Sequence, residues 1–278
     1  MTTPLTPLAP IPPSDDRTDR MPPRAHCIAD SAGGLTFDVC DHGGVAPAHL
    51  LLAERTSGEE VRLPLTPAGD GRLRASLPIS VGLPEGRWDV YAQVAGGQPV
   101  RLTPGTNDLR SLVDRAPGGS RGYVAVRVPY TTKHGNLTVR SWLRAPHAEA
   151  GELHIRDGEL TVHGRVYGTE FTAKAHAEIR ARAAAGPVLR GELTADGAEF
   201  TLRIGYDELS EGRWDLWLRP GGDDGPEVRV ARILDDVADK KPIFVYPAAR
   251  VSADGRELSA EPYYTLDNDL AVVVSAGS

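Results

Sequence analysis

The nine residues LPEGRWDVY at positions 83–91 decide the expected fold, because they recur as LSEGRWDLW at positions 209–217, 126 residues further along the chain. A second stretch follows each of them. PYTTKHGNLTV at 129–139 matches PYYTLDNDLAV at 262–272, now at a distance of 133 residues. Matches in the same order indicate that the chain contains one structural unit twice.

A third match lies upstream and supports the duplication. LTF at 35–37 corresponds to LTV at 160–162, at a distance of 125 residues. Because the distance grows from 126 to 133 residues, the second copy should hold a seven-residue insertion. We expect it near 248–259, where Asp254-Gly255 is typical of a turn.

The chain should therefore have three parts. Residues 1–24 hold seven prolines beside Thr, Ser, Asp and Arg, a composition with too little apolar surface to offset the entropy of ordering, so we predict a disordered arm. Residues 25–147 form the first copy and residues 148–278 the second, with 145–151 as the linker. The arm has two interpretations: a dispensable tail, or a segment that docks into an aromatic-lined groove of a partner.

Residue patterning within each copy predicts short β-strands. In 87–94 apolar residues at every second position alternate with polar ones, which is typical of a half-buried strand. The 30 Gly and 23 Pro of the chain leave little room for long helices. The segment Phe171 to Ala185 fits either a short helix, because it is rich in Ala, Arg and Glu, or a strand, because its apolar residues alternate. The other predicted strands cover 34–40, 49–54, 73–78, 123–128, 160–167, 200–204, 228–233 and 270–274.

The repeated stretch resembles part of a known fold. About seven strands per copy, separated by turn signals, are typical of an immunoglobulin-like sandwich. The pattern Leu83-x-x-Gly86-x-Trp88-x-Val90 resembles the Leu-x-x-Gly-x-Tyr-x-Val corner of fibronectin-type sandwiches, with Trp in the place of Tyr. Since an indole donates a hydrogen bond but accepts none, Trp88 Nε1 should donate the bond that closes the corner. We predict an all-β protein of two tandem immunoglobulin-like β-sandwich domains.

Charge and hydropathy limit the partners. A net charge of −7 and the lack of a Lys and Arg cluster argue against nucleic acid as a partner. No stretch of about 18 apolar residues and no basic flank before an apolar core occurs. We therefore expect neither a transmembrane segment nor a secretory signal, and we expect a cytoplasmic location.

The two cysteines, Cys27 and Cys40, occur in the first copy alone, and we expect free thiols.

The first candidate site is the outward face of the repeated strand. This face carries, in the two copies, Arg87, Asp89 and Tyr91, and Arg213, Asp215 and Trp217. Such side chains can stack on sugars or clasp anionic groups. They can equally pair across neighbouring strands of a solvated face, at about 0.2–1 kcal/mol per pair. Their presence in both copies favours the structural interpretation.

The second candidate site is the hairpin after Tyr130. Gly135-Asn136, and Asn268-Asp269 in the second copy, supply residues that tolerate the backbone of a tight turn. The charges at the tip differ, because Lys133-His134 becomes Leu266-Asp267. A site for an anion or a sugar would then belong to the first copy. The alternative is that this is an ordinary polar loop tip.

The sequence contains no catalytic or metal-binding signature. The eight histidines lack the spacing of zinc ligands, and the densest group, Asp38, Asp41 and His42 beside Cys40, is best explained by chance. Neither a serine elbow nor a phosphate-binding loop occurs. Paired carboxylates lie in expected loops, where nothing would raise a pKa for acid catalysis. We predict no catalytic residue, no metal site and no cofactor.

A second resemblance concerns function. The motif Gly-Arg-Trp-Asp at 86–89 and 212–215, with the Tyr-x-Thr-x-x-Gly-Asn-Leu type final strand at 130–137, resembles accessory β-domains that accompany actinobacterial cell-wall polymer glycosyl- and glycerophosphotransferases. This resemblance implies an accessory protein that holds an acceptor glycan or a transferase partner near the cytoplasmic membrane.

Three hypotheses about function follow. The favoured one is a non-catalytic binding or assembly protein, an adaptor that engages a protein partner through its sandwich surfaces. The alternative is carbohydrate binding through Trp217, Tyr91 or the Lys133 hairpin, in an accessory protein of cell-wall polymer biosynthesis. The third is an enzyme whose site lies between the domains, where pockets often form. The sequence leaves open the oligomeric state and whether the two copies pack together.

Overall fold

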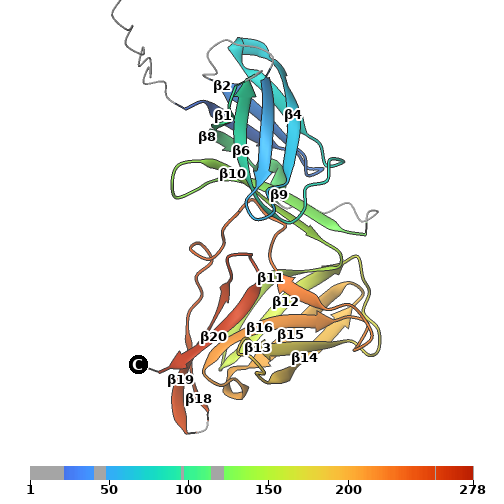
Figure 1. Ribbon diagram of the computed structural model, residues 1–278. Helices are drawn as coiled ribbons and strands as arrows, with labels where there is room; N and C mark the ends of the chain where they lie inside the picture. The colour runs from blue at the N-terminus through green and yellow to red at the C-terminus, as the bar shows by residue number, and fades with distance from the viewer. Residues whose placement is uncertain (1–21, 41–47, 95–96, 114–121, 254, 278) are drawn as a thin grey trace, which may run out of the picture.

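A computed structural model of the chain describes residues 22–40, 48–94, 97–113, 122–253 and 255–277. In these residues the chain is all-β, with twenty strands, three short 3-10 turns and no α-helix. The strands form two bodies stacked end to end, one from each copy (Figure 1). Except for its last three residues, the predicted arm at 1–24 lies outside the described residues.

Ten strands come from each copy. The first copy contains β1 (Arg24–Ala29), β2 (Leu35–Cys40), β3 (Ala48–Glu54), β4 (Glu60–Pro67), β5 (Leu73–Leu77), β6 (Gly86–Val94), β7 (Val100–Arg101), β8 (Thr103–Asp108), β9 (Val124–Thr131) and β10 (Leu137–Arg144). The second copy contains β11 (His147–Arg156), β12 (Glu159–Tyr167), β13 (His176–Ala181), β14 (Val188–Asp196), β15 (Glu199–Gly205), β16 (Gly212–Arg219), β17 (Val228–Ala231), β18 (Ala249–Ala253), β19 (Arg256–Tyr264) and β20 (Leu270–Ala276).

The two copies share one topology. Strand β6 pairs with β3 along one edge and with β7 and β10 along the other. Strand β16 pairs in the same way with β13, and with β17 and β20. The first strand of each copy also has a parallel neighbour, β8 for β1 and β17 for β11. The second copy has the extra strand β18, which pairs with β19 in the region where the change of spacing predicts an insertion.

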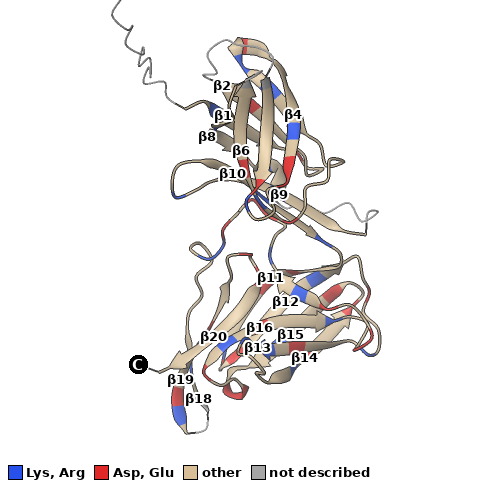
Figure 2. Ribbon diagram, in the orientation of Figure 1, with Lys and Arg blue, Asp and Glu red and all other residues tan. Residues whose placement is uncertain are grey.

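Each copy buries a core of its own. Alternate residues face inward along the strands; in β5, for example, Leu73, Ala75 and Leu77 are buried while the residues between them are exposed. The cores meet at the junction, because Ala231 and Ile233 of the second copy pack within the core of the first. Basic and acidic residues are interspersed over both bodies (Figure 2).

The predicted tryptophan corner is present in both copies. Trp88 is fully buried and its Nε1 donates to the carbonyl oxygen of Pro84 at 3.1 Å. Trp214 is also buried, and its Nε1 donates to the carbonyl of Ser210 at 2.9 Å. The indole therefore closes the corner as a donor, as its chemistry requires.

The structure corrects the sequence-based expectations for two segments. The helical alternative for 171–185 is wrong: the strand β13 forms at its centre, pairs on both edges, and buries Ala177 and Ile179. The linker predicted at 145–151 is also wrong. Strand β11 begins at His147, because this stretch pairs with β12 and, in parallel, with β17.

None of the described segments forms a helix long and apolar enough to span a membrane.

Replacing Trp88 by Phe should lower the free energy of unfolding by about 1–3 kcal/mol, because the variant loses the corner hydrogen bond and leaves a void in the core. Urea denaturation followed by circular dichroism measures the change. Tyr91→Phe, on the outward face of the same strand, is the control and should change stability by less than about 0.5 kcal/mol. Equal effects of the two substitutions would contradict the assigned role of the corner.

The two cysteines are free, as the sequence predicts, and should differ in reactivity. Cys27 is buried, and burial raises the pKa of its thiol well above the usual range, whereas Cys40 is partly exposed. Since the thiolate is the reactive form, iodoacetamide should alkylate Cys40 in the native protein and reach Cys27 after unfolding. Peptide mass spectrometry can measure both yields. Alkylation of Cys27 at the same native rate would show that the first core opens readily.

Candidate functional site

The outward polar stripe forms the same ion-pair network in both copies. Asp89 Oδ1 accepts hydrogen bonds from Arg55 Nε at 2.8 Å and from Arg101 Nη2 at 2.6 Å. In the second copy Asp215 pairs with Arg182, and with Arg229 at 2.6 Å. Each carboxylate therefore holds together two arginines from neighbouring segments. A network that both copies share stabilises the common fold.

The aromatic residues of the stripe are already in contact with arginine. The guanidinium of Arg101 lies over the ring of Tyr91, 4.9 Å from its centroid. Two guanidiniums, those of Arg180 and Arg229, lie 4.7 and 5.2 Å from the ring of Trp217. A sugar that stacked on either ring would have to compete with these cation–π contacts.

The hairpin tips of the two copies have the same backbone structure. We call Thr132–Asn136 loop 1 and Thr265–Asp269 loop 2. In loop 1 the amide of Gly135 donates to the carbonyl of Thr132 at 2.9 Å, and that of Asn136 donates to the Thr132 hydroxyl at 3.1 Å. Loop 2 repeats both bonds around Thr265. The turn residues are Gly135 and Asn268, with φ values of 75° and 61°. The loops are thus matched in shape and differ in side chains.

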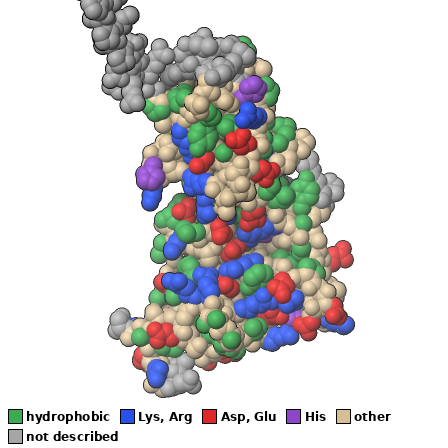
Figure 3. Space-filling model, viewed as in Figure 1, with side chains coloured by type: hydrophobic (Ala, Val, Ile, Leu, Met, Phe, Trp, Pro, Cys, Tyr) green, Lys and Arg blue, Asp and Glu red, His purple; other side chains and the backbone are tan. Residues whose placement is uncertain are grey.

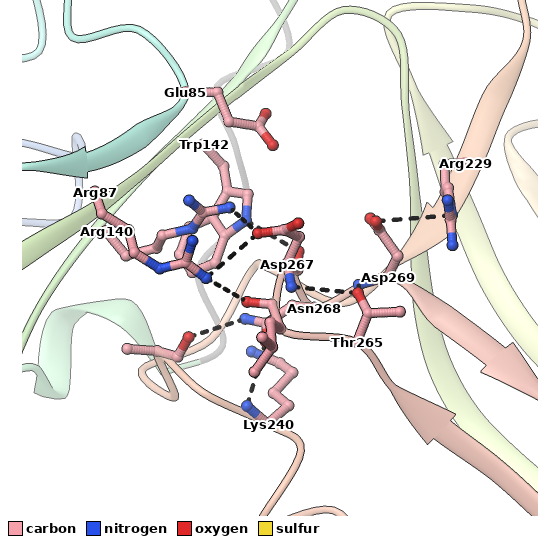
Figure 4. A network of polar contacts seen from close by, with 12 residues as sticks. Glu85, Arg87, Arg140, Trp142, Arg229, Lys240, Thr265, Asp267, Asn268 and Asp269 are labelled. Carbon is pink, nitrogen blue, oxygen red and sulfur yellow. Dashed lines mark hydrogen bonds and ion pairs between the residues drawn. The ribbon is translucent and has the colours of Figure 1, made fainter. Parts of the chain in front are cut away.

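Loop 2 docks on the first copy through Asp267 (Figure 4). The carboxylate of Asp267 pairs with Arg140 Nη2 at 2.8 Å and with Arg87 Nη2 at 3.4 Å. Its carbonyl oxygen accepts a hydrogen bond from Trp142 Nε1 at 3.2 Å. One residue of the second copy therefore binds three side chains of β6 and β10.

Two further contacts strengthen this docking. The carbonyl of Leu266 accepts a hydrogen bond from Arg87 at 3.0 Å, and Asp269 pairs with Arg144 at 2.8 Å. The side chain of Arg140 is only 7% exposed, whereas that of Asp267 is 52% exposed. The buried arginine thus receives its counter-charge from the other copy.

The segment between β17 and β18 forms a second contact between the copies. Ile233 packs in the first core, and Glu149 holds the amides of Ile233 and Leu234 at 2.9–3.1 Å. Lys240 is fully buried, and its Nζ donates to Asp235 at 2.6 Å. Burial lowers the pKa of Lys240 despite this partner. The segment is therefore held closely between the two bodies.

A groove of about 1370 Å³ lies at the junction of the two copies (Figure 3). We call it the junction groove. The first copy contributes loop 1, the end of β3 with the turn after it (54–59), Arg101 of β7 and parts of β6, β9 and β10. The second copy contributes Ala238, Asp239 and the tip of loop 2. Glu54 is its most buried carboxylate, and hydrogen bonds from the Ser57 and Thr56 amides hold the pKa of this group below its usual value.

The structure brings together some of the predicted site residues and separates others. Five line the junction groove: Arg87, Asp89, Tyr130, Lys133 and His134. Four lie outside its lining: Tyr91, Arg213, Asp215 and Trp217.

Three residues that matter for the junction were not predicted from the sequence. Arg140, Trp142 and Arg144 carry the docking of loop 2, yet they follow an ordinary strand pattern. A comparison of the two copies could have indicated them. Arg140 lies opposite Arg87 in the first copy, whereas Val273 lies opposite the equivalent Arg213 in the second.

One group of possible metal ligands occurs among the described residues, and the sequence did not predict it. Atoms of His176, Glu178 and Asp223 lie within 4.8 Å of one another. Glu178 already pairs with Arg180 and, at 3.3 Å, with Arg219. Two guanidiniums at one carboxylate oppose the binding of a cation there.

Comparison with known proteins gives weak structural likenesses. No protein-family model and no curated protein matches the chain. Residues 217–571 of TarS from S. aureus match at 13% identity and a TM-score of 0.31, over 65% of this chain and 54% of that chain. The chain thus spans about half of that fragment.

Two other structures are similar over more of this chain. Pullulanase from Anoxybacillus sp. LM18-11, complexed with maltotriose, has 13% identity and a TM-score of 0.28, over 84% of this chain and 27% of that chain. The FN1–FN3 domains of chicken CNTN1 have 8% identity and a TM-score of 0.18, over 88% of this chain and 76% of that chain. These TM-scores are too low to carry an argument about function.

Replacing Asp267 by Ala should lower the free energy of unfolding by about 1–2 kcal/mol, because Arg140 stays buried without its carboxylate while the exposed half of Asp267 limits the loss. Urea denaturation measures the change. Asp223→Ala, whose side chain is 77% exposed, is the control and should be neutral within about 0.5 kcal/mol. If both variants were equally stable, loop 2 would not be the main link between the copies.

Proposed function

We propose that this protein is a non-catalytic adaptor, built from two immunoglobulin-like units, that binds a protein partner in the junction groove. The proposal is carried by the position of the residues that differ between the two copies. Residues common to both copies, such as Asp89 and its arginines, form the framework. Residues peculiar to the first copy, above all Lys133 and His134 of loop 1, line the groove.

The groove is built on fixed elements. Loop 1 has its own internal hydrogen bonds, and loop 2 is held by Arg140, Arg87 and Trp142. A surface whose walls are ordered before binding loses less entropy when a partner arrives. This preorganisation supports a binding role for the junction as a whole.

The carboxylates of the groove support a role in binding over one in catalysis. An acid catalyst at neutral pH needs a raised pKa. Burial alone would raise that of Glu54, but its amide hydrogen bonds lower it. Asp89 is engaged by two arginines. The hydrogen bonds and ion pairs therefore favour a structural role for these two carboxylates.

Carbohydrate binding, as in an accessory protein of cell-wall polymer biosynthesis, is the weaker proposal. It relies on exposed aromatic faces, and arginines lie over Tyr91 and Trp217. Tyr130 is the aromatic residue that lines the junction groove. A protein partner fits the charged and polar lining better.

Immobilised full-length protein should retain a stoichiometric partner from an extract of its native cells, and the charge-reversed variant Lys133→Glu/His134→Glu should lose it. The matched control is Arg156→Glu/Lys174→Glu, which alters two exposed cations of the second copy outside the groove. This control should retain the partner. Absence of any stoichiometric partner, or its loss from both variants alike, would count against the proposed function.

A further inference from the structure

The first copy already binds a carboxylate in the junction groove, and that carboxylate belongs to the same chain. Asp267 lies between Arg140 at 2.8 Å and Arg87 at 3.4 Å. We call these two arginines the clamp. Charge-assisted pairs of this kind are among the stronger polar contacts of proteins. The contact shows which chemistry this wall of the groove accepts.

The clamp is not saturated by its internal ligand. The Nε of Arg140 is buried and has no hydrogen-bond partner among the described residues. The side chain of Arg87 is 35% exposed and makes the longer of the two contacts. Asp267 itself is half exposed, so solvent and ligands reach the carboxylate. A second carboxylate can approach Arg87, the exposed half of the clamp, beside Asp267.

The remaining charges of the groove are divided between its two sides. On the first copy, the side chains of Lys133 and His134 are exposed and have no described hydrogen-bond or ion-pair partner. Among the exposed carboxylates of that side of the groove, the side chain of Glu59 alone has no described partner. On the second copy, the exposed groove charges are acidic, Asp239 and Asp267. An acidic ligand would therefore lie along the wall of the first copy, between loop 1 and the clamp.

The counterpart of this wall in the second copy lacks the clamp. Arg213 keeps the position of Arg87, but Val273 stands opposite it where Arg140 stands in the first copy. The two facing arginines at this register position therefore occur in the first copy and not in the second. A volume of about 1370 Å³ also exceeds the roughly 300–1,000 Å³ of small-molecule pockets, and it suits a length of chain.

We infer that the junction groove takes an extended acidic segment of a protein partner, with side-chain carboxylates on the clamp and on Lys133 and His134. This inference rests on the proposed adaptor function and names the class of partner. Asp267 stays on Arg140 and shares the clamp with the incoming carboxylate. Neutralising the acidic side of the groove should then strengthen binding, which a purely structural role for these residues would not produce.

Fluorescence anisotropy of a labelled deca-glutamate peptide with the full-length protein, at about 50 mM salt where surface charges are weakly screened, tests the inference. Lys133→Glu/His134→Glu should weaken binding about tenfold or more, because the new carboxylates repel the acidic peptide. Asp239→Asn should strengthen binding about two- to fivefold, because it removes a charge that repels the peptide. Arg156→Glu/Lys174→Glu is the control, with at least as large a change in charge, and should bind within about twofold of the wild type.

Three outcomes would overturn the inference. The peptide fails to bind, or both double variants weaken binding equally, or Asp239→Asn has no effect. Polyphosphate of equal charge is the second probe, and tighter binding of it with the same response to the variants would assign the groove to an anionic polymer instead. If native extract yields a groove-dependent partner that deca-glutamate does not displace, the adaptor function stands and the acidic class of partner is wrong.

Discussion

The ion pair between Asp267 and Arg140 is the contact on which the arrangement of the two copies depends. Arg140 is almost fully buried, and a buried guanidinium is costly unless an anion meets it. The anion comes from loop 2 of the other copy, so satisfying this charge also docks the loop. Ile233, packed into the first core, adds an apolar contact at the same junction. The junction groove exists because these contacts hold loop 2 opposite loop 1.

Comparison of the two copies distinguishes the residues that maintain the fold from the residues that have diverged. Trp88 and Trp214 close the same corner with the same hydrogen bond, and Asp89 and Asp215 hold the same pair of arginines. Side chains that serve the fold are therefore kept in both copies. The tips of the hairpins share a backbone but differ in charge, and one tip is docked while the other is exposed. Divergence has occurred where the two copies meet.

Sequence patterns predicted much of the fold because the relevant signals are local. Alternation in β6 and the Trp88 motif mark a half-buried strand and its corner. The pattern missed eight of the described strands: β1, β4, β7, β8, β11, β14, β18 and β19. In β8, for example, Pro104 and Gly105 interrupt a short strand, and β14 is half exposed along its length. The junction groove could not be predicted in this way. Arg140 and Asp267 follow no shared local pattern, and their pairing depends on how the two bodies meet.

Amide hydrogen exchange of the full-length protein tests this account most directly. Loop 1 and loop 2 have the same internal hydrogen bonds, but Asn268 is also held within its own copy by Lys240 and Ala238. Docking on the first copy is therefore reported by the protection that loop 2 loses in Asp267→Ala. We expect slow exchange for the amides of Asn268 and Asp269 in the wild type and faster exchange in Asp267→Ala, with unchanged exchange for the matching Gly135 and Asn136 of loop 1. Equal protection of loop 2 in the wild type and in Asp267→Ala would contradict this account, because loop 2 would then not depend on its docking contact with the first copy.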